Sequence, residues 1–229
     1  MKRDYINSPI LVTGAARSGT SMIGGIINLC GAFGGNMNQM FENTQILNTV
    51  VKPYLRELGV DQNGQYPLPD VNNLKIPISF ASKTLSIIQA QEYTDGAWMY
   101  KGTSMSVMYP VWHYAFPNAK WIVVRRKDDD IVDSCMHTAF MNAFDKEENV
   151  KAINATDKKD AWYWWVRQHN RRFVEMIEQG LNVKQIHPER MVYGDYSQIY
   201  EMLDWLGLKW NSSVLNYIEP RIVNQRKNL

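Results

Sequence analysis

The sequence predicts an α/β fold in which helices cover a mostly parallel sheet. Three observations lead to this prediction. Short β-branched runs alternate along the chain with segments of helical periodicity. A glycine-rich turn joins the first such run to the first helical segment. The chain has 229 residues, which suits one domain with a sizeable core, and we assign that domain to residues 1–229.

The first predicted unit is a strand, a tight turn and a helix. The run PILVTG, at residues 9–14, is short, β-branched and closed by glycine, which is typical of a buried strand. After the turn, apolar residues recur at helical spacing from Ser21 to Cys30, and Gly31 is the predicted stop. This order of elements places the glycine-rich turn at the N-terminus of a helix.

Three further strands are predicted in the segments WMYKG, KWIVVRR and RMVYGD, at 98–102, 120–126 and 190–195. Between the first two of these, YPVWHYAFPNA predicts a helix that ends near Pro117, a connection that suits parallel strands. The segment SQIYEMLDWLGLKW predicts an amphipathic helix that ends at Gly207. Its apolar side consists of Ile199, Met202, Leu203 and Leu206.

Two other segments have a distinctive composition. Residues 59–77 are rich in proline, glycine and polar residues and predict a long loop, a feature that is often functional in compact domains. In AWYWWVRQHNRRF, at 161–173, four successive aromatic residues cover most of a helix circumference. Either two of them are core and the others pack under loops or at a subunit contact, or one lines the acceptor cleft of an enzyme.

Composition narrows the function classes. A formal net charge of +2 argues against a general nucleic-acid partner but permits a local basic cleft. With only Cys30 and Cys135, no disulfide framework is implied. The apolar run near the N-terminus is broken by glycine, so it predicts a strand and not a signal peptide, and no stretch approaches the roughly 20 apolar residues that span a bilayer. We therefore expect a cytoplasmic protein without a membrane span.

The turn GAARSGTS is a candidate anion site. Gly14 and Gly19 have the G-x-x-x-x-G spacing of a nucleotide phosphate loop, which points backbone N–H groups and a helix N-terminus at an anion. Thr20 stands where such a loop has its lysine, which weakens the grip of a kinase on β- and γ-phosphates. Arg17 instead places a guanidinium inside the turn, where it can fork onto an anion. The alternative is a strand-to-helix turn without a ligand.

A second constellation follows the strand at 120–126. Arg126 ends that strand, and Ser134 lies eight residues later on the next predicted helix. Because ligands of such sheets bind outside the carboxyl ends of the strands, these two side chains can converge on one phosphate. The aspartates at 128–130 are predicted to supply an N-cap and negative charge to a solvated helix start.

The segment TGAARSGTSMIGGIINLCGA, together with Arg126 and Ser134, resembles the sulfotransferase family, whose members transfer a sulfuryl group from 3′-phosphoadenosine 5′-phosphosulfate (PAPS). The resemblance implies a three-layer fold like that of P-loop nucleotide hydrolases. It implies that the first loop binds the 5′-phosphosulfate and that Arg126 and Ser134 bind the 3′-phosphate. Ala16 and Asp128 replace prolines of the family pattern, and neither change removes a contacting side chain. The implied loop contacts are Arg17, Ser18, Gly19, Thr20 and Ser21.

Three further segments agree with this resemblance, which covers about half of the chain. NQMFENTQILNTVV is similar to a segment of bacterial and protein-tyrosine sulfotransferases whose glutamate, here Glu42, is the implied general base. WMYKGTS is similar to the segment whose lysine, here Lys101, faces the transferring group, although the proline of that segment is Ser104 or absent here. MVYGDYSQIYEMLDWLGLKW is similar to a C-terminal segment, which puts Tyr193 near the adenine and Gly194 in place of an acid.

The implied reaction is in-line transfer to an acceptor hydroxyl, with adenosine 3′,5′-bisphosphate as the product. Glu42 would take the proton, while Arg17 and Lys101 would neutralise the developing charge. The alternatives for Glu42 and Lys101 are ordinary surface positions. The scheme needs no metal, and the four histidines share no ligand spacing; of these, His137 is a minor alternative base on the 3′ side of the nucleotide. The other three are His113, His169 and His187.

The acceptor and two rival functions stay open at this point. The acceptor is a carbohydrate, a small alcohol or phenol, a lipid or a protein tyrosine, and the Glu42 segment leans towards carbohydrate or tyrosine. One rival is a P-loop kinase or nucleotide hydrolase. This function needs a loop lysine, which the sequence lacks, and an Mg²⁺-binding aspartate, for which Asp195 is only a weak candidate. The other is a non-catalytic nucleotide-binding protein of the same fold. The oligomeric state is open as well.

Overall fold

Four parallel strands form the centre of the computed structural model, which describes residues 5–226. Their order across the sheet is β2-β1-β3-β4, and each neighbouring pair is parallel. Leu11 of the first strand pairs with Tyr100 on one side and with Trp121 on the other. The strands are β1 (Ile10–Thr13), β2 (Met99–Lys101), β3 (Lys120–Val124) and β4 (Val183–Ile186).

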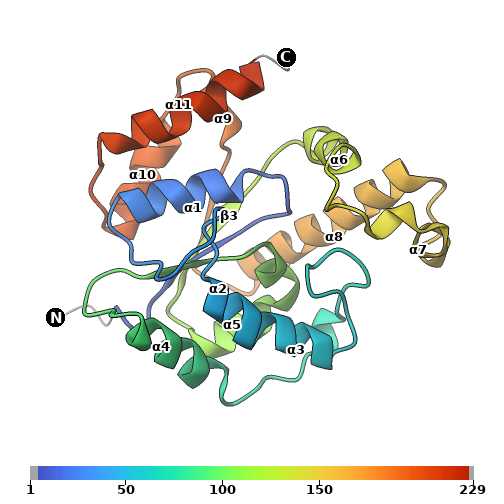
Figure 1. The fold of residues 1–229 in the computed structure, drawn as a ribbon, viewed down its shortest axis with the longest axis horizontal. Coiled ribbons are helices and arrows are strands. Elements are labelled where there is room, and N and C mark those ends of the chain that lie inside the picture. The colour runs from blue at the N-terminus through green and yellow to red at the C-terminus, as the bar shows by residue number, and fades with distance from the viewer. Residues whose placement is uncertain (1–4, 227–229) are drawn as a thin grey trace.

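Helices cover both faces of this sheet (Figure 1). Successive strand residues point to opposite faces, so Ile10 and Val12 pack on one face and Leu11 on the other. The first face is covered by α1 (Thr20–Leu29), α9 (Glu189–Val192), α10 (Ser197–Leu206) and α11 (Ser213–Arg226). The predicted three-layer α/β fold is confirmed.

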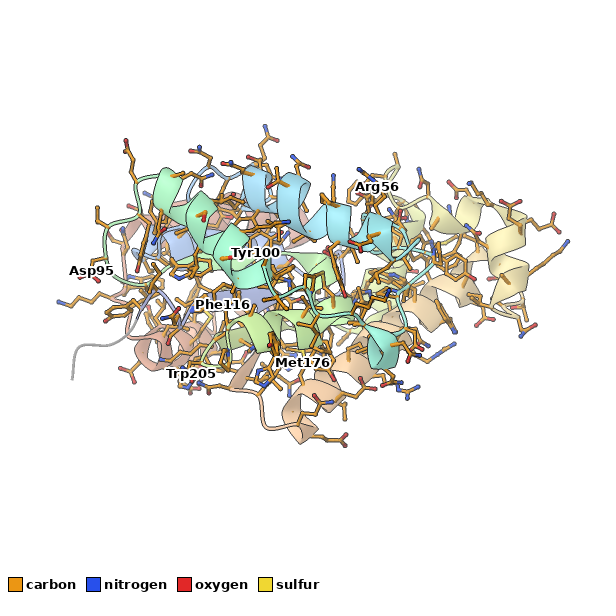
Figure 2. All side chains as sticks on the ribbon, turned by 90° about the horizontal axis from the view of Figure 1, so that it is seen from below. Arg56, Asp95, Tyr100, Phe116, Met176 and Trp205 are labelled. Atoms are coloured by element: carbon orange, nitrogen blue, oxygen red, sulfur yellow. The ribbon has the colours of Figure 1, made fainter. Side chains whose placement is uncertain are left out.

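The second face carries the aromatic part of the core. Tyr100, Phe116 and Met176 belong to this cluster and are labelled in Figure 2. Below the sheet in Figure 1 lie α3, α4 and α5. The elements of this face are α2 (Thr44–Ile46), the π-helix η1 (Leu47–Val51), α3 (Lys52–Glu57), α4 (Phe80–Ala90), the 3-10 helix η3 (Thr103–Met108), α5 (Tyr109–Ala115) and the end of α8 (Lys158–Glu178), which contributes Phe173 and Met176.

A third apolar cluster lies beside the sheet. It joins α6 (Asp128–Met136), α7 (Glu147–Ala152) and α8 (Lys158–Glu178), and it includes Ala15 from the turn after β1. The 3-10 helix η4 (Ala143–Asp145) connects α6 to α7. This cluster positions the segment after β3 against the segment after β1.

Most predicted elements are present. The predicted helices correspond to α1, α5 and α10, and α10 ends at Gly207, which has the left-handed φ of 77°. Residues 59–77 form the expected long loop, interrupted only by the 3-10 helix η2 (Val71–Asn73). Across residues 5–226, no helix combines the length and the apolar character that a bilayer span requires.

Two local predictions are wrong. Residues 190–195 are not a strand: α9 ends at Val192 and a turn follows, so Met191 and Val192 are buried on a short helix. The fourth strand is β4, an edge strand in which only Ile186 is buried, and its polar residues lack the apolar run that predicts a strand. At α6, Lys127 occupies the N-cap position and the three aspartates fill the first turn instead.

Candidate active site

The candidate site lies at the carboxyl edge of the sheet. Parallel strands bring their carboxyl ends to the same edge. The turn after β1 begins there, β2 ends in Lys101, and the segment after β3 leads to Arg126. Residues from three distant parts of the sequence therefore meet at this edge.

The turn at 14–19 is tightly wound, and at Gly14 it leaves no space for a larger residue. Arg17 and Gly19 both have positive φ, at 73° and 97°. A Cβ added to Gly14 would lie 2.6 Å from the Val124 carbonyl oxygen and from the Ser18 Oγ atom, so only glycine fits there. Helix α1 then begins with no side-chain cap from the residues that the structure describes, which leaves its first N–H groups directed outward.

Ser18 is the polar group in this turn that lacks a partner. Its Oγ atom is buried and has no hydrogen-bond partner within residues 5–226. Unpaired buried hydroxyls are costly, so a group held this way is an expected ligand contact. Together with the helix N-terminus and the Arg17 guanidinium, it fits an anion.

Arg17 and the segment after β3 contact each other directly. The Arg17 Nε atom donates to the Ser134 Oγ atom at 2.9 Å, although the two residues are 117 positions apart. Arg126 donates from Nη1 to the Arg17 carbonyl oxygen at 3.2 Å and pairs with Asp130 at 3.4 Å. Two guanidinium groups and two hydroxyls thus surround the start of α1.

A second cluster consists of Glu42 and Lys101. The Lys101 Nζ atom lies 3.0 Å from the Glu42 Oε1 atom, and the side chains are 3% and 17% exposed, respectively. Burial lowers the pKa of Lys101, and the Glu42 carboxylate opposes that shift. The alternative, in which these two residues are ordinary surface positions, is therefore not what the structure shows.

A tightly bonded loop at residues 36–43 presents Glu42. The Asn38 Oδ1 atom accepts hydrogen bonds from the backbone N–H groups of Met40 and Glu42, at 2.8 and 3.1 Å. The Asn38 Nδ2 atom lies 3.4 Å from the Glu42 Oε2 atom. Asn43 then caps α2 by accepting from the Ile46 N–H group. Asn38 was not among the predicted residues, although an asparagine that can bond to the backbone of its own turn is a signal in the sequence.

The remaining predicted residues, Thr20, Ser21 and Tyr193, take no part in the contacts described above. Thr20 is buried in the first turn of α1, and the Ser21 hydroxyl donates to the Met40 sulfur atom at 3.6 Å. Tyr193 follows α9 and is 77% exposed. Phe140, which no pattern in the sequence indicated, lies with its ring centroid 5.8 Å from the Arg17 Cζ atom.

Two of the histidines, His137 and His169, contact groups other than the predicted site side chains. His137 Nδ1 lies 2.7 Å from the carbonyl oxygen of Asp133 at the end of α6. His169 is buried, and its Nδ1 atom lies 2.7 Å from the Ser106 Oγ atom. Within the described chain, no three His, Cys, Asp or Glu side chains gather as metal ligands do.

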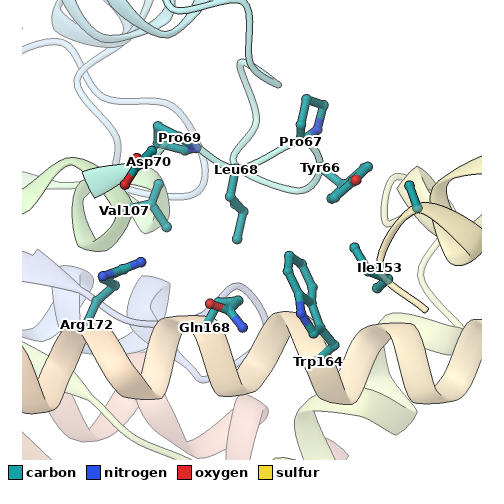
Figure 3. A pocket seen from close by; sticks show the side chains of 11 residues that line it. Tyr66, Pro67, Leu68, Pro69, Asp70, Val107, Ile153, Trp164, Gln168 and Arg172 are labelled. Carbon is teal, nitrogen blue, oxygen red and sulfur yellow. The ribbon is translucent and has the colours of Figure 1, made fainter. Parts of the chain in front are cut away.

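A separate cavity of about 470 Å³ lies between the long loop and α8 (Figure 3). Trp164, Gln168 and Arg172 line its α8 side, and Leu68 points towards them from the loop. None of the predicted site residues, all of which lie within residues 5–226, lines it. Trp162 and Trp165 are core residues and Trp164 packs against the loop, which confirms the first of the two expectations for this aromatic run.

A sequence model of the sulfotransferase family matches residues 9–212. Sulfotransferase STF9 from Mycobacterium avium is similar in structure, with a TM-score of 0.52 and 14% identity over 97% of this chain and 68% of that one. Sulfotransferase STF1 from Mycobacterium tuberculosis H37Rv has a TM-score of 0.46 and 11% identity over 91% and 70%. A comparison with curated proteins gave no match.

Proposed function

This chain belongs to the sulfotransferase family, and we propose that it transfers a sulfuryl group from PAPS to an acceptor hydroxyl. The observation that carries the proposal is the contact between Arg17 and Ser134, with Arg126 bonded to the same turn. It places the two family segments that would bind the phosphate groups of the donor side by side. A phosphate loop for ATP does not require this second basic segment.

The residues present fit the two anionic ends of the donor. The turn at 17–21 would hold the 5′-phosphosulfate through the start of α1, the Ser18 hydroxyl and the Arg17 guanidinium. Arg126 and Ser134 would hold the 3′-phosphate. The exposed ring of Tyr193 is available to stack on the adenine.

Glu42 and Lys101 would carry the chemistry. The acceptor oxygen forms a bond to sulfur while the bond from sulfur to the bridging oxygen breaks, and the electron pair leaves with the 5′-phosphate. The Glu42 carboxylate accepts the proton of the hydroxyl. Lys101 and Arg17 stabilise the charge that develops on the sulfuryl and bridging oxygens, so the scheme uses cationic side chains in place of a metal.

The acceptor class follows from the same segment. The similarity of the Glu42 segment to bacterial and protein-tyrosine sulfotransferases favours a carbohydrate or protein-tyrosine hydroxyl over a small alcohol, a phenol or a lipid.

A binding titration tests the donor site. Adenosine 3′,5′-bisphosphate is titrated against ADP and AMP without magnesium, on the wild-type chain and on Arg126→Ala and Ser134→Ala. Arg125→Ala is the matched control, because Arg125 donates to Gln185 and lies over Phe173 instead. We expect tight binding of the bisphosphate alone, lost in both site variants and kept in the control. A preference for ADP or ATP with Mg²⁺ that ignores these changes would overturn the proposal.

A further inference from the structure

The residue before Glu42 has an unusual backbone conformation. Phe41 has φ at 59°, in the left-handed region that bulky residues avoid. Such a conformation persists only when its surroundings hold it in place, and it is typical of functional sites. The Phe41 N–H group donates to the Asn38 carbonyl oxygen at 3.0 Å, which fixes the residue from one side.

Tyr217 of α11 holds the other side. Its ring meets the Phe41 ring edge-on, at 5.7 Å between centroids and 88° between planes. Its hydroxyl also donates to the Ser21 carbonyl oxygen at 3.1 Å, in the first turn of α1. One side chain therefore touches the loop that carries Glu42 and the turn that would hold the phosphosulfate. Tyr217 lies beyond residue 212, where the family match ends.

The sequence of α1 makes room for this contact. A Cβ added to Gly25 would lie 2.2 Å from the Tyr217 hydroxyl, so the close approach of α11 depends on that glycine. Gly24 lies beside the Phe41 Cβ atom and the Lys101 Cγ atom, each 3.4 Å from an added Cβ. In Figure 1, α11 lies on the outer side of α1, and the two helices are in contact.

We propose that Tyr217 is a positioning residue that sets the Glu42 loop at a fixed place relative to the donor-binding turn. The inference rests on the proposed function. In-line transfer requires the base to lie at a defined position relative to the sulfur atom, and a displacement of about 1 Å lowers the rate about 10²-fold. Tyr217 fixes this position because it contacts both Ser21 and Phe41. A weaker second link runs from the Ser21 hydroxyl to the Met40 sulfur atom.

Hydrogen exchange of the full chain tests this role. Amide exchange is followed in residues 14–21 and 36–43, with and without saturating adenosine 3′,5′-bisphosphate. The variants are Tyr217→Leu, which removes both contacts, and Gly25→Ala, which displaces the tyrosine without altering it. Tyr114→Leu is the control, because Tyr114 is 63% exposed on α5. Denaturant unfolding of each variant shows that it is folded.

In the wild type and the control, we expect the bisphosphate to protect both segments. In Tyr217→Leu and Gly25→Ala, we expect protection of 14–21 to remain and protection of 36–43 to be lost, an effect that general destabilisation does not produce. Equal protection of 36–43 in all four chains would overturn the inference and leave the donor site intact. A wild type in which the bisphosphate leaves 14–21 unprotected would overturn the donor site, and the inference with it.

Discussion

Lys101 and Glu42 form an ion pair at 3.0 Å across 59 positions of sequence, with the lysine almost completely buried. The lysine ends β2, and the glutamate lies in a loop that packs against α1. Burial lowers the pKa of Lys101, and the Glu42 carboxylate opposes that shift and favours the charged lysine. The pair places a carboxylate and a cation at one point, which suits the proposed transfer to an acceptor hydroxyl.

Glu42→Gln tests the base. We expect turnover to fall by about 10²–10⁴-fold, which is the usual contribution of a general base, while binding of adenosine 3′,5′-bisphosphate is retained. The measurement is the rate of bisphosphate release from PAPS in the presence of a sugar, phenol or tyrosyl-peptide acceptor. Glu178→Gln, on an exposed position of α8, is the control. Unchanged turnover in Glu42→Gln would remove the glutamate from the mechanism.

The same variant has a defined effect on stability. Without Glu42, the buried ammonium group of Lys101 is uncompensated, and we expect a loss of about 2 kcal/mol at pH 7, less than for a fully buried pair. The pKa of Lys101 is already lowered from 10.5 in the folded chain, and this change lowers it further. Between the folded and unfolded pKa values, the unfolded chain binds more protons, so stability rises with pH. In urea unfolding, the free energy of unfolding should increase more between pH 7 and pH 9 for Glu42→Gln than for the wild type.

Ser18→Ala separates binding from stability. The Ser18 hydroxyl is buried without a partner in the described chain, so its removal should leave the unfolding free energy unchanged or raise it by about 1 kcal/mol. The bisphosphate should bind about tenfold more weakly, which corresponds to one lost hydrogen bond to an anion. Ser106→Ala is the contrasting control, because that buried hydroxyl bonds to His169 and to the Thr103 carbonyl oxygen, and its loss should destabilise the fold.

His169 should make stability depend on acid pH. Burial, with a smaller effect of Arg172, lowers the pKa of His169 from 6.5 to about 3. Between these values the unfolded chain is protonated and the folded chain is not, so stability is fully present above pH 6.5 and is lost as pH falls towards 3. Unfolding curves at pH 7, 5 and 4 should show a smaller decline for His169→Gln than for the wild type. Parallel declines in the two chains would mean that this histidine titrates normally.

Substitution by alanine should have opposite effects on stability at Gly14, in the turn, and at Gly24, in α1. In Gly14→Ala, the new methyl group would lie 2.6 Å from the backbone oxygen of Val124. We expect the free energy of unfolding to fall by about 1–3 kcal/mol and the binding of the bisphosphate to be lost as well. In Gly24→Ala, the neighbours lie at 3.4 Å and alanine favours the helix, so we expect no loss and a gain of up to about 1 kcal/mol. Thermal unfolding of both variants measures the difference.

The sequence by itself determined the α/β class, three of the four strands and the glycine-rich turn. These features depend on local signals: β-branched runs, helical periodicity and the spacing of Gly14 and Gly19. The edge strand β4 was missed because a half-exposed strand has no continuous apolar run. The segment at 190–195 was misassigned because Met191 and Val192 are buried on one side of a short helix, which a brief apolar run does not distinguish from a strand.

Only the tertiary structure decided which side chains meet. The ion pair of Glu42 with Lys101 and the hydrogen bond from Arg17 to Ser134 join residues 59 and 117 positions apart. Distances of that kind depend on strand order and on how the loops pack, and no local pattern encodes them. The same holds for Tyr217, whose contacts with Ser21 and Phe41 exist because α11 packs against Gly25 of α1.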